Sequence, residues 1–169
     1  MTAFASAREA RYKDAMATSG SGSVHERLNT ELFGYDRVMG LRFVHATLEE
    51  IVAEYDIDEQ HHQPYGIVHG GVHCGVVEAV CSTGAGLNAT ARGQRGVVGI
   101  ENHTSFIRAA RRGRVRVRAV PITRGRRSQL WEATARDASD RVIATGRVRL
   151  LCLEEDTELA GEPLGRPST

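Results

Sequence analysis

One apolar stretch decides the fold of this chain, and it reads Gly71-Val-His-Cys-Gly-Val-Val-Glu78-Ala-Val-Cys-Ser-Thr-Gly-Ala85. Within it, Val72, Val76 and Val80 recur every four residues, and a second apolar series runs beside them. This period predicts a helix over about 71–90 that is buried on more than one side. Glycines at 75, 84 and 86 disfavour a helix intrinsically. They indicate that a sheet or a partner helix approaches this helix closely.

Glu78 is the acid in the middle of this apolar helix. Burying a carboxylate costs free energy unless the group is paired or neutralised, and a fold does not need that cost. The helix also opens on Gly70-Gly71, where free backbone N–H groups and the positive end of the helix dipole can hold an anion. An acid and an oxyanion cradle on one helix favour acyl-transfer chemistry. The alternatives are a structural acid paired with an arginine and a simple tight turn.

The flanking segments predict one sheet around this helix. We expect a short helix at 24–33 and strands at 41–48 and 51–57 before it, with a polar loop from residue 58. Four strands follow it, at 97–107, 114–122, 129–136 and 142–152. This order predicts an α+β domain over 24–153, with an antiparallel sheet curled around one long helix. Residues 1–23 are expected to form a flexible leader, and 154–169 a loose tail.

Composition is that of an ordinary soluble domain: 169 residues, 41% hydrophobic and 25% charged. No apolar run is long enough to cross a bilayer, and the first residues lack the pattern of a signal peptide. We therefore expect a cytoplasmic protein with no membrane partner. Cys74, Cys81 and Cys152 form no CxxC pair, which favours reduced core thiols over disulfides.

The net charge is only +1, but acids gather in 26–60 and arginines in 92–149. Arg114, Arg116 and Arg118 alternate with apolar residues, which is typical of a solvated strand face. The other interpretation of the arginines is a phosphate-rich ligand. A nucleic-acid partner is disfavoured, because the pI is about 7.8 and the arginines are spread along strand faces.

Two motifs carry a family resemblance. The first is Gly66-Ile-Val-His69-Gly70-Gly71, with Glu78 following eight residues after Gly70; the second is Asn102-His-Thr-Ser-Phe106-Ile-Arg108. Together they resemble the hotdog-fold acyl-CoA thioesterases, in the branch of the phenylacetate-pathway and 4-hydroxybenzoyl-CoA thioesterases. The resemblance covers residues 40–153. Ala109 stands where that family's second motif has proline.

The resemblance implies hydrolysis of an acyl- or aryl-CoA thioester to the free acid and CoA. No separate cofactor is implied, because CoA is part of the substrate. Catalytic roles would fall on the Gly70 N–H as oxyanion donor and on Glu78 as nucleophile or general base. Three further residues would support them: Gln63 assisting the reacting group, Ser82 placing Glu78 or water, and His69 shaping the turn. Gly71 would belong to the substrate cradle.

The resemblance also implies a homo-oligomer, either a dimer or a tetramer built from dimers. Its active sites would combine Gly70 of one chain with Glu78 of another. Residues 97–107 suit a sheet that continues across the subunit boundary.

Several residues keep alternative interpretations. The turn Arg124-Gly-Arg126-Arg127-Ser128 could grip CoA phosphates, with Arg111 and Arg112 nearby, or be an ordinary polar hairpin. Ser82 could bond back to a helix carbonyl, and Gln63 could be an exposed loop residue. No zinc motif supports a site at His61, His62, His69 and His73, so no metal is expected. Cys74, one turn before Glu78, could be a Cys/His nucleophile, but its position favours a small buried thiol.

Two other functions compete with hydrolysis. One is a non-catalytic protein that holds acyl-CoA, in which the acid could have been lost. The other is an acyl-thioester dehydratase or hydratase, whose paired His and acid are poorly matched by His69 and Glu78.

Overall fold

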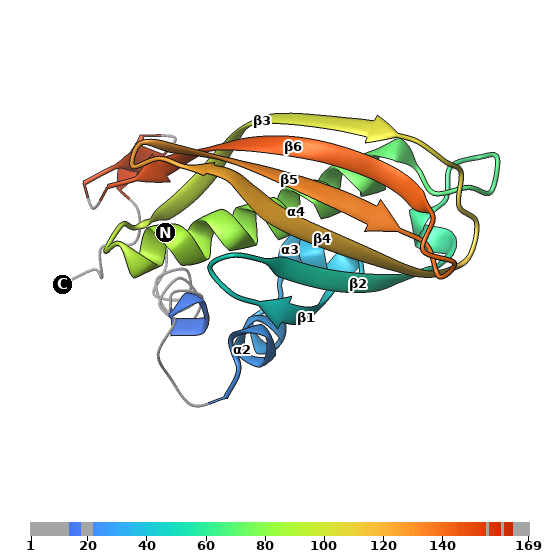
Figure 1. The fold of residues 1–169 in the computed structure, drawn as a ribbon, viewed down its shortest axis with the longest axis horizontal. Coiled ribbons are helices and arrows are strands. Elements are labelled where there is room, and N and C mark those ends of the chain that lie inside the picture. Colours follow the sequence, from blue (N-terminus) through green and yellow to red (C-terminus); the bar gives the residue numbers. More distant parts are fainter. Residues whose placement is uncertain (1–13, 18–21, 155, 160, 164–169) are drawn as a thin grey trace.

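In the computed structural model, which describes residues 14–17, 22–154, 156–159 and 161–163, a six-stranded antiparallel sheet curls around one long helix (Figure 1). The strand order in the sheet is β1-β2-β4-β5-β6-β3. The elements, in chain order, are α2 Val24–Thr30, α3 Gly34–Val38, β1 Arg42–Ala46, β2 Ile51–Ile57, the 3-10 turn η1 Glu59–His61, α4 Gly70–Ala91, β3 Gly96–Phe106, β4 Gly113–Arg124, β5 Ser128–Arg136, β6 Val142–Leu153, β7 Glu158–Leu159 and β8 Glu162–Pro163.

The expected α+β hotdog architecture is confirmed, and two local expectations are wrong. The helix expected at 24–33 is broken, because Phe33 is extended and Gly34 adopts a φ of 56°. A separate short helix, α3, therefore begins at Gly34. The first strand is also shorter than expected, because Thr47 and Glu50 close the turn into β2 with an N–H to carbonyl bond of 2.9 Å.

The core lies between the inner face of the sheet and α4. Val115, Val117 and Ala119 of β4 are fully buried, whereas the arginines between them are exposed, as their alternation predicts. Trp131 of β5 packs against Gly84 so closely that a Cβ there would lie 2.5 Å from the indole ring. A glycine is needed at this position, because any side chain would push the helix off the sheet.

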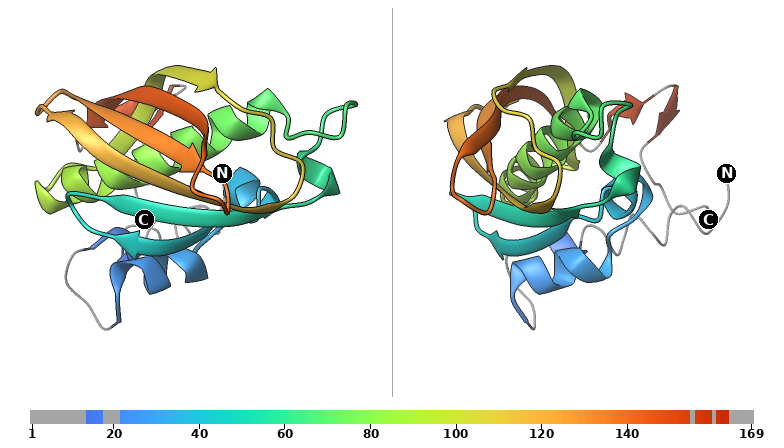
Figure 2. Two further views of the ribbon diagram at one scale, coloured as in Figure 1. Left: turned by 45° about the vertical axis from the view of Figure 1, so that its right-hand side comes forward. Right: turned by 90° about the vertical axis from the view of Figure 1, so that its right-hand side faces the viewer.

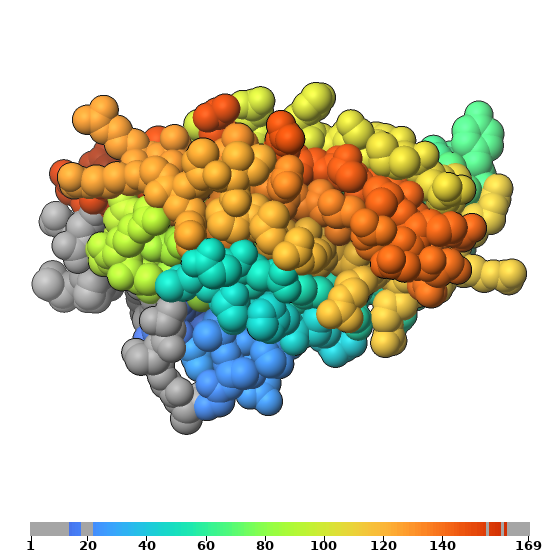
Figure 3. Space-filling view, in the orientation of Figure 1, coloured from blue at the N-terminus to red at the C-terminus, as the bar shows by residue number. Residues whose placement is uncertain are grey.

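The sheet leaves one side of α4 uncovered. Viewed end-on, the strands lie around α4 except on one side (Figure 2, right). From the outer face of the sheet, the strands hide α4 apart from its C-terminal end (Figure 3). Cys74, Gly75, Glu78 and Ser82 are half-buried, unlike the buried residues between them, and they form a stripe along the uncovered side.

Parts of the expected leader and tail lie outside the described residues, namely 1–13, 18–21, 155, 160 and 164–169. Of the remaining leader residues, Ala15 and Met16 are buried against the core, and Ser23 caps α2. In the tail, β7 and β8 pair as a small hairpin. No helix among the described residues is long and apolar enough to span a membrane.

Candidate active site

The Glu78 carboxylate is held by two neutral donors. The Ser82 hydroxyl, one turn further along α4, donates to Oε1 at 3.0 Å, and Nδ2 of Asn102 on β3 donates to Oε2 at 3.0 Å. Neither donor carries a positive charge, so these two bonds hold the carboxylate without a cation. Ser82 thus differs from its neighbour Thr83, whose hydroxyl bonds back to the Ala79 carbonyl at 2.8 Å. The structure therefore brings Ser82 to the acid, as expected, and replaces the alternative arginine partner with an amide.

Asn102 is the site residue that the sequence argument missed. The Thr104 hydroxyl donates to its Oδ1 at 2.7 Å, so the amide N–H groups point toward α4. There, Nδ2 reaches both the Cys74 carbonyl, at 3.1 Å, and Glu78. The backbone of Gly99, also on β3, passes so close that a Cβ on it would collide with the Glu78 carboxylate. A polar residue within an exposed strand was the available signal, but its direction depends on the packing of β3 against α4.

The start of α4 presents one free amide. His69 is the N-cap residue, and its Nδ1 accepts the Gly71 N–H at 2.8 Å. The expected role of His69 in shaping the turn matches this geometry. Since the Gly71 N–H is occupied, Gly70 is left as the first-turn donor, and the described residues offer it no acceptor. The Phe106 ring lies over Gly70, where a Cβ would be 2.6 Å from it.

A cavity of about 180 Å³ opens beside Gly70. Gln63 lines it, so this loop residue lies at the predicted cradle. His73 and Phe106 form part of its wall, with their ring centroids 5.8 Å apart, and Arg108 lies at its edge. Burial lowers the pKa of His73, so its imidazole is neutral at ordinary pH. The cavity therefore combines an apolar wall, a helix N-terminus and an amide side chain.

The two halves of the site are apart within one chain. Gly70 and Glu78 are eight residues apart on α4, which is about 12 Å along the helix axis. A carbonyl group whose oxygen contacts the Gly70 N–H needs its attacking group within about 3–3.5 Å of the carbonyl carbon. Within one chain, the Gly70 N–H and the Glu78 carboxylate therefore lie too far apart along α4 to contact the same reacting group.

Comparisons with known proteins agree with this architecture. Residues 65–144 match the model of the thioesterase superfamily. The chain is 40% identical over 121 residues to Rv1847 of Mycobacterium tuberculosis, named as a candidate esterase, and the match covers 71% of this chain and 86% of that protein. The chain belongs to the thioesterase superfamily.

Further relatives support the assignment. The 1,4-dihydroxy-2-naphthoyl-CoA hydrolase of Escherichia coli is 33% identical over 110 residues, 65% of this chain and 79% of that enzyme. Among solved structures, Rv1847 superposes with a TM-score of 0.69 over 71% of this chain and 96% of that chain. The thioesterase HI1161 of Haemophilus influenzae superposes with a TM-score of 0.71 at 27% identity, over 77% of this chain and 90% of that chain. Thioester hydrolysis is the general chemistry that these relatives indicate for this member of the superfamily.

The arginines expected at the CoA phosphates fall into two separate groups in this thioesterase. Arg111 and Arg112 precede β4, and Arg126, Arg127 and Ser128 follow it. A twelve-residue strand spans roughly 36–40 Å, so the expectation that the groups lie near each other is wrong within one chain. Arg111 donates to the carbonyls of Tyr65 and Gly66, at 2.7 and 3.1 Å, at the Gly70 end. At the other end, Nη2 of Arg126 lies 3.7 Å from Oε1 of Glu154.

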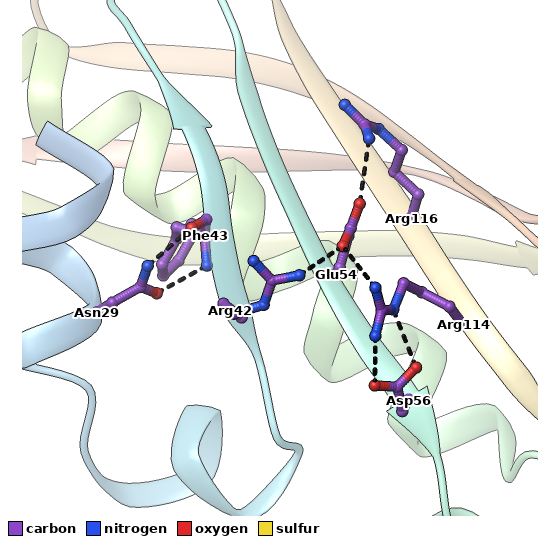
Figure 4. A network of polar contacts seen from close by, with 7 residues as sticks. All are labelled: Asn29, Arg42, Phe43, Glu54, Asp56, Arg114 and Arg116. Carbon is purple, nitrogen blue, oxygen red and sulfur yellow. Dashed lines mark hydrogen bonds and ion pairs between the residues drawn. The ribbon is translucent and has the colours of Figure 1, made fainter. Parts of the chain in front are cut away.

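The β4 arginines of the thioesterase are paired with acids on β2 or in the turn before it. Glu54 accepts from Arg42 at 2.7 Å and from Arg116 at 3.1 Å, and Arg114 binds Asp56 through two bonds of 3.0 Å (Figure 4). The acidic and basic segments of the sequence are thus neighbours in the sheet. This pairing fits the solvated strand face and removes these arginines as candidates for a phosphate site.

The histidines considered for zinc have other contacts. His61 is buried, with its Nδ1 accepting the Asp58 N–H and its Nε2 3.1 Å from the Met39 carbonyl. His62 Nε2 lies 2.8 Å from the Arg111 carbonyl. In the described part of the thioesterase, no cluster of three or more His, Cys, Asp or Glu side chains could hold a metal ion. Cys81 is buried, and burial first, then the nearby Glu78, raises the pKa of its thiol, so it is a poor nucleophile.

Proposed function

We propose that this thioesterase hydrolyses the thioester of an acyl- or aryl-CoA, with Glu78 as nucleophile or general base and the Gly70 N–H as oxyanion donor. The observation that carries the proposal is a carboxylate held by Ser82 and Asn102 on the uncovered side of α4. A purely structural acid would be paired with one of the many arginines. Here both partners are neutral donors, and they orient the carboxylate as a nucleophile or a base requires.

The chemistry follows from this geometry. Glu78 either attacks the thioester carbonyl carbon or removes a proton from a water that does so. The carbonyl oxygen then becomes an oxyanion, and one well-placed donor at such a position is worth about 2.7–4 kcal/mol. In the general-base route, the proton that Glu78 took from water passes to the CoA sulfur as the C–S bond breaks, which leaves the free acid and the CoA thiol. In the nucleophilic route, CoA leaves as the thiolate, and water then hydrolyses the acyl–Glu78 anhydride to the free acid and restores the carboxylate. Gln63 is placed to contact the reacting group from the cavity beside Gly70.

The active site is assembled from two chains, with Gly70 from one and Glu78 from the other. The separation of these residues along α4 favours this arrangement over a site within one chain. β3 is an edge strand that pairs only with β6 in the described chain, so its free edge can continue the sheet into a second copy. The assembly is a dimer or a tetramer of such dimers.

Aromatic acyl-CoAs are included in the substrate class because the E. coli relative is named for a naphthoyl-CoA. For the CoA phosphates, Arg112 and Arg108 lie at the Gly70 end of their own chain. Arg126, Arg127 and Ser128 lie at the far end of β4, so they can serve only a site to which another chain contributes.

The test is a hydrolysis screen over short, medium, long and aromatic acyl-CoAs with a thiol-trapping reagent. Glu78→Gln, run beside wild type, should lower kcat by roughly 10²–10⁴-fold while CoA-thioester binding persists, because the amide cannot attack or accept a proton. Ser139→Ala, in the β5–β6 turn, is the control and should keep the wild-type rate. Full activity in Glu78→Gln would refute the assigned mechanism, and no turnover of any CoA thioester by wild type would refute the function.

A further inference from the structure

An exposed apolar pair on α3 lies beside the uncovered side of α4, and the proposed chemistry gives it no role. Tyr35 and Val38 are three residues apart on α3, so they share one face, and the two residues are 56% and 58% exposed. Large apolar groups exposed side by side, next to a reactive carboxylate, are typical of a ligand surface.

Tyr35 packs directly on α4. A Cβ at Gly75 would lie 2.6 Å from its Cε1, so the ring rests against the bare helix backbone. Met39, at the end of α3, supports the same position from beside it, 2.9 Å from that Cβ. Because residue 75 is a glycine, the ring can lie close to the helix while more than half of Tyr35 stays accessible.

Glu78 reaches the same turn of α4 from the other side. Helical side chains lean toward the N-terminus, so a residue at 78 covers the turn at 74 and 75. The contacts agree, because the Asn102 amide bonds both the Cys74 carbonyl and the Glu78 carboxylate. Asn102 comes from β3 and Tyr35 from α3, so the acid and the phenol ring flank one turn, Cys74-Gly75.

We propose that Tyr35 is a specificity-determining residue that binds the acyl portion of the substrate and selects an aromatic acyl group. The inference rests on the proposed function, since it takes the Glu78 side as the thioester end of the substrate. A flat aryl group stacks in an offset arrangement on the accessible surface of Tyr35, with Val38 extending the apolar wall. An alkyl chain buries apolar area there but gains no ring–ring interaction, so the surface prefers aryl over alkyl.

The experiment separates binding from turnover by using the Glu78→Gln background. The dissociation constants of benzoyl-CoA and hexanoyl-CoA, two ligands of similar acyl size, are measured by calorimetry with and without Tyr35→Leu. Loss of one aromatic pair should weaken benzoyl-CoA about 3–10-fold and hexanoyl-CoA less than about 2-fold. Tyr35→Phe keeps the ring and should restore the preference. Ile122→Ala removes an exposed apolar side chain of β4 and should change neither value.

Equal weakening of both ligands, or no weakening of either, would overturn the role of Tyr35, and so would loss of the preference in Tyr35→Phe. Absence of binding by either acyl-CoA would overturn it as well. The proposed function is judged separately, by hydrolysis with the Glu78-intact protein. A Tyr35 preference seen in binding, without turnover by wild type, would keep this inference and refute the hydrolase.

Discussion

The orientation of a single amide controls the surroundings of the Glu78 carboxylate. The Thr104 hydroxyl fixes the Asn102 oxygen, so only N–H groups face the acid. A carboxylate held by two donors is fixed in direction, as a nucleophile or base requires. In the proposed mechanism, Asn102 is therefore a positioning residue, acting through Glu78 rather than on the substrate.

Removing that amide should slow the reaction. Asn102→Ala should lower kcat about 10-fold or more with little change in KM, since a hydrogen bond to a charged group contributes roughly 1.5–3 kcal/mol. Asn102→Asp should be worse, because a second carboxylate would repel the first. His103→Ala is the matched control, since His103 lines a hollow on the sheet with Glu132 and Arg147. Steady-state kinetics that show a KM effect alone would contradict the positioning role.

A second residue-scale prediction concerns His73, whose pKa burial lowers from its ordinary 6.5. Below pH 6.5, His73 takes up a proton in the unfolded chain but not yet in the folded chain, because its folded pKa is lower. The contribution of His73 to the free energy of unfolding is therefore fully present above pH 6.5 and is lost as the pH falls below it. Between about pH 7.5 and about pH 5.5, wild type should therefore lose more unfolding free energy than His73→Leu. Urea denaturation at both pH values measures this. An identical pH dependence in the two proteins would show that His73 does not contribute.

At the scale of elements, sequence periodicity predicted the helix and the strands whose burial pattern repeats along the chain. It missed the features that depend on a single residue. The α4 period and the β4 alternation set nearly correct bounds, because every turn or pleat repeats the same burial. The break at Gly34 was missed, because a positive φ leaves no periodic trace. Ser82 and Glu78 share a helix face that spacing reveals, but Asn102 and Tyr35 come from other elements. Their arrival at the same turn depends on tertiary packing that spacing does not encode.

The pairing of β2 with β4 makes an element-scale prediction. Glu54 is only 12% exposed and has Arg42, Arg114 and Arg116 within 4 Å, whereas Asp56 is 67% exposed and pairs with Arg114. Glu54→Gln should cost roughly 1 kcal/mol of unfolding free energy, because it leaves three arginines facing one another. Asp56→Asn should cost less. Thermal unfolding in low and high salt tests this, and high salt should reduce the difference in stability loss between the two variants. Equal losses for the two variants would argue against a network centred on Glu54.

For the whole molecule, the proposed mechanism makes one copy chemically incomplete. The curled sheet buries most of α4 and leaves its reactive stripe on one side, flanked by the free edge of β3. The donor at Gly70 and the acid at Glu78 are both present but are two turns apart. In the proposed dimer, a second copy along β3 offers the missing half to each chain, and two-fold symmetry makes the two sites equivalent.

Mixed dimers test this directly. Gly70 is the first residue of α4, where proline is tolerated but has no N–H to donate. Because its Cβ would strike the Phe106 ring, Gly70→Pro is combined with Phe106→Ala in the same chain, and this double variant should lose the oxyanion donor and keep the helix. Glu78→Gln loses the acid. Each variant alone should be inactive, yet a purified heterodimer carrying one of each should recover about half of the wild-type rate, because one of its two sites is intact. Circular dichroism of both parents controls for folding. An inactive heterodimer, or a fully active monomer by light scattering, would place the whole site in one chain.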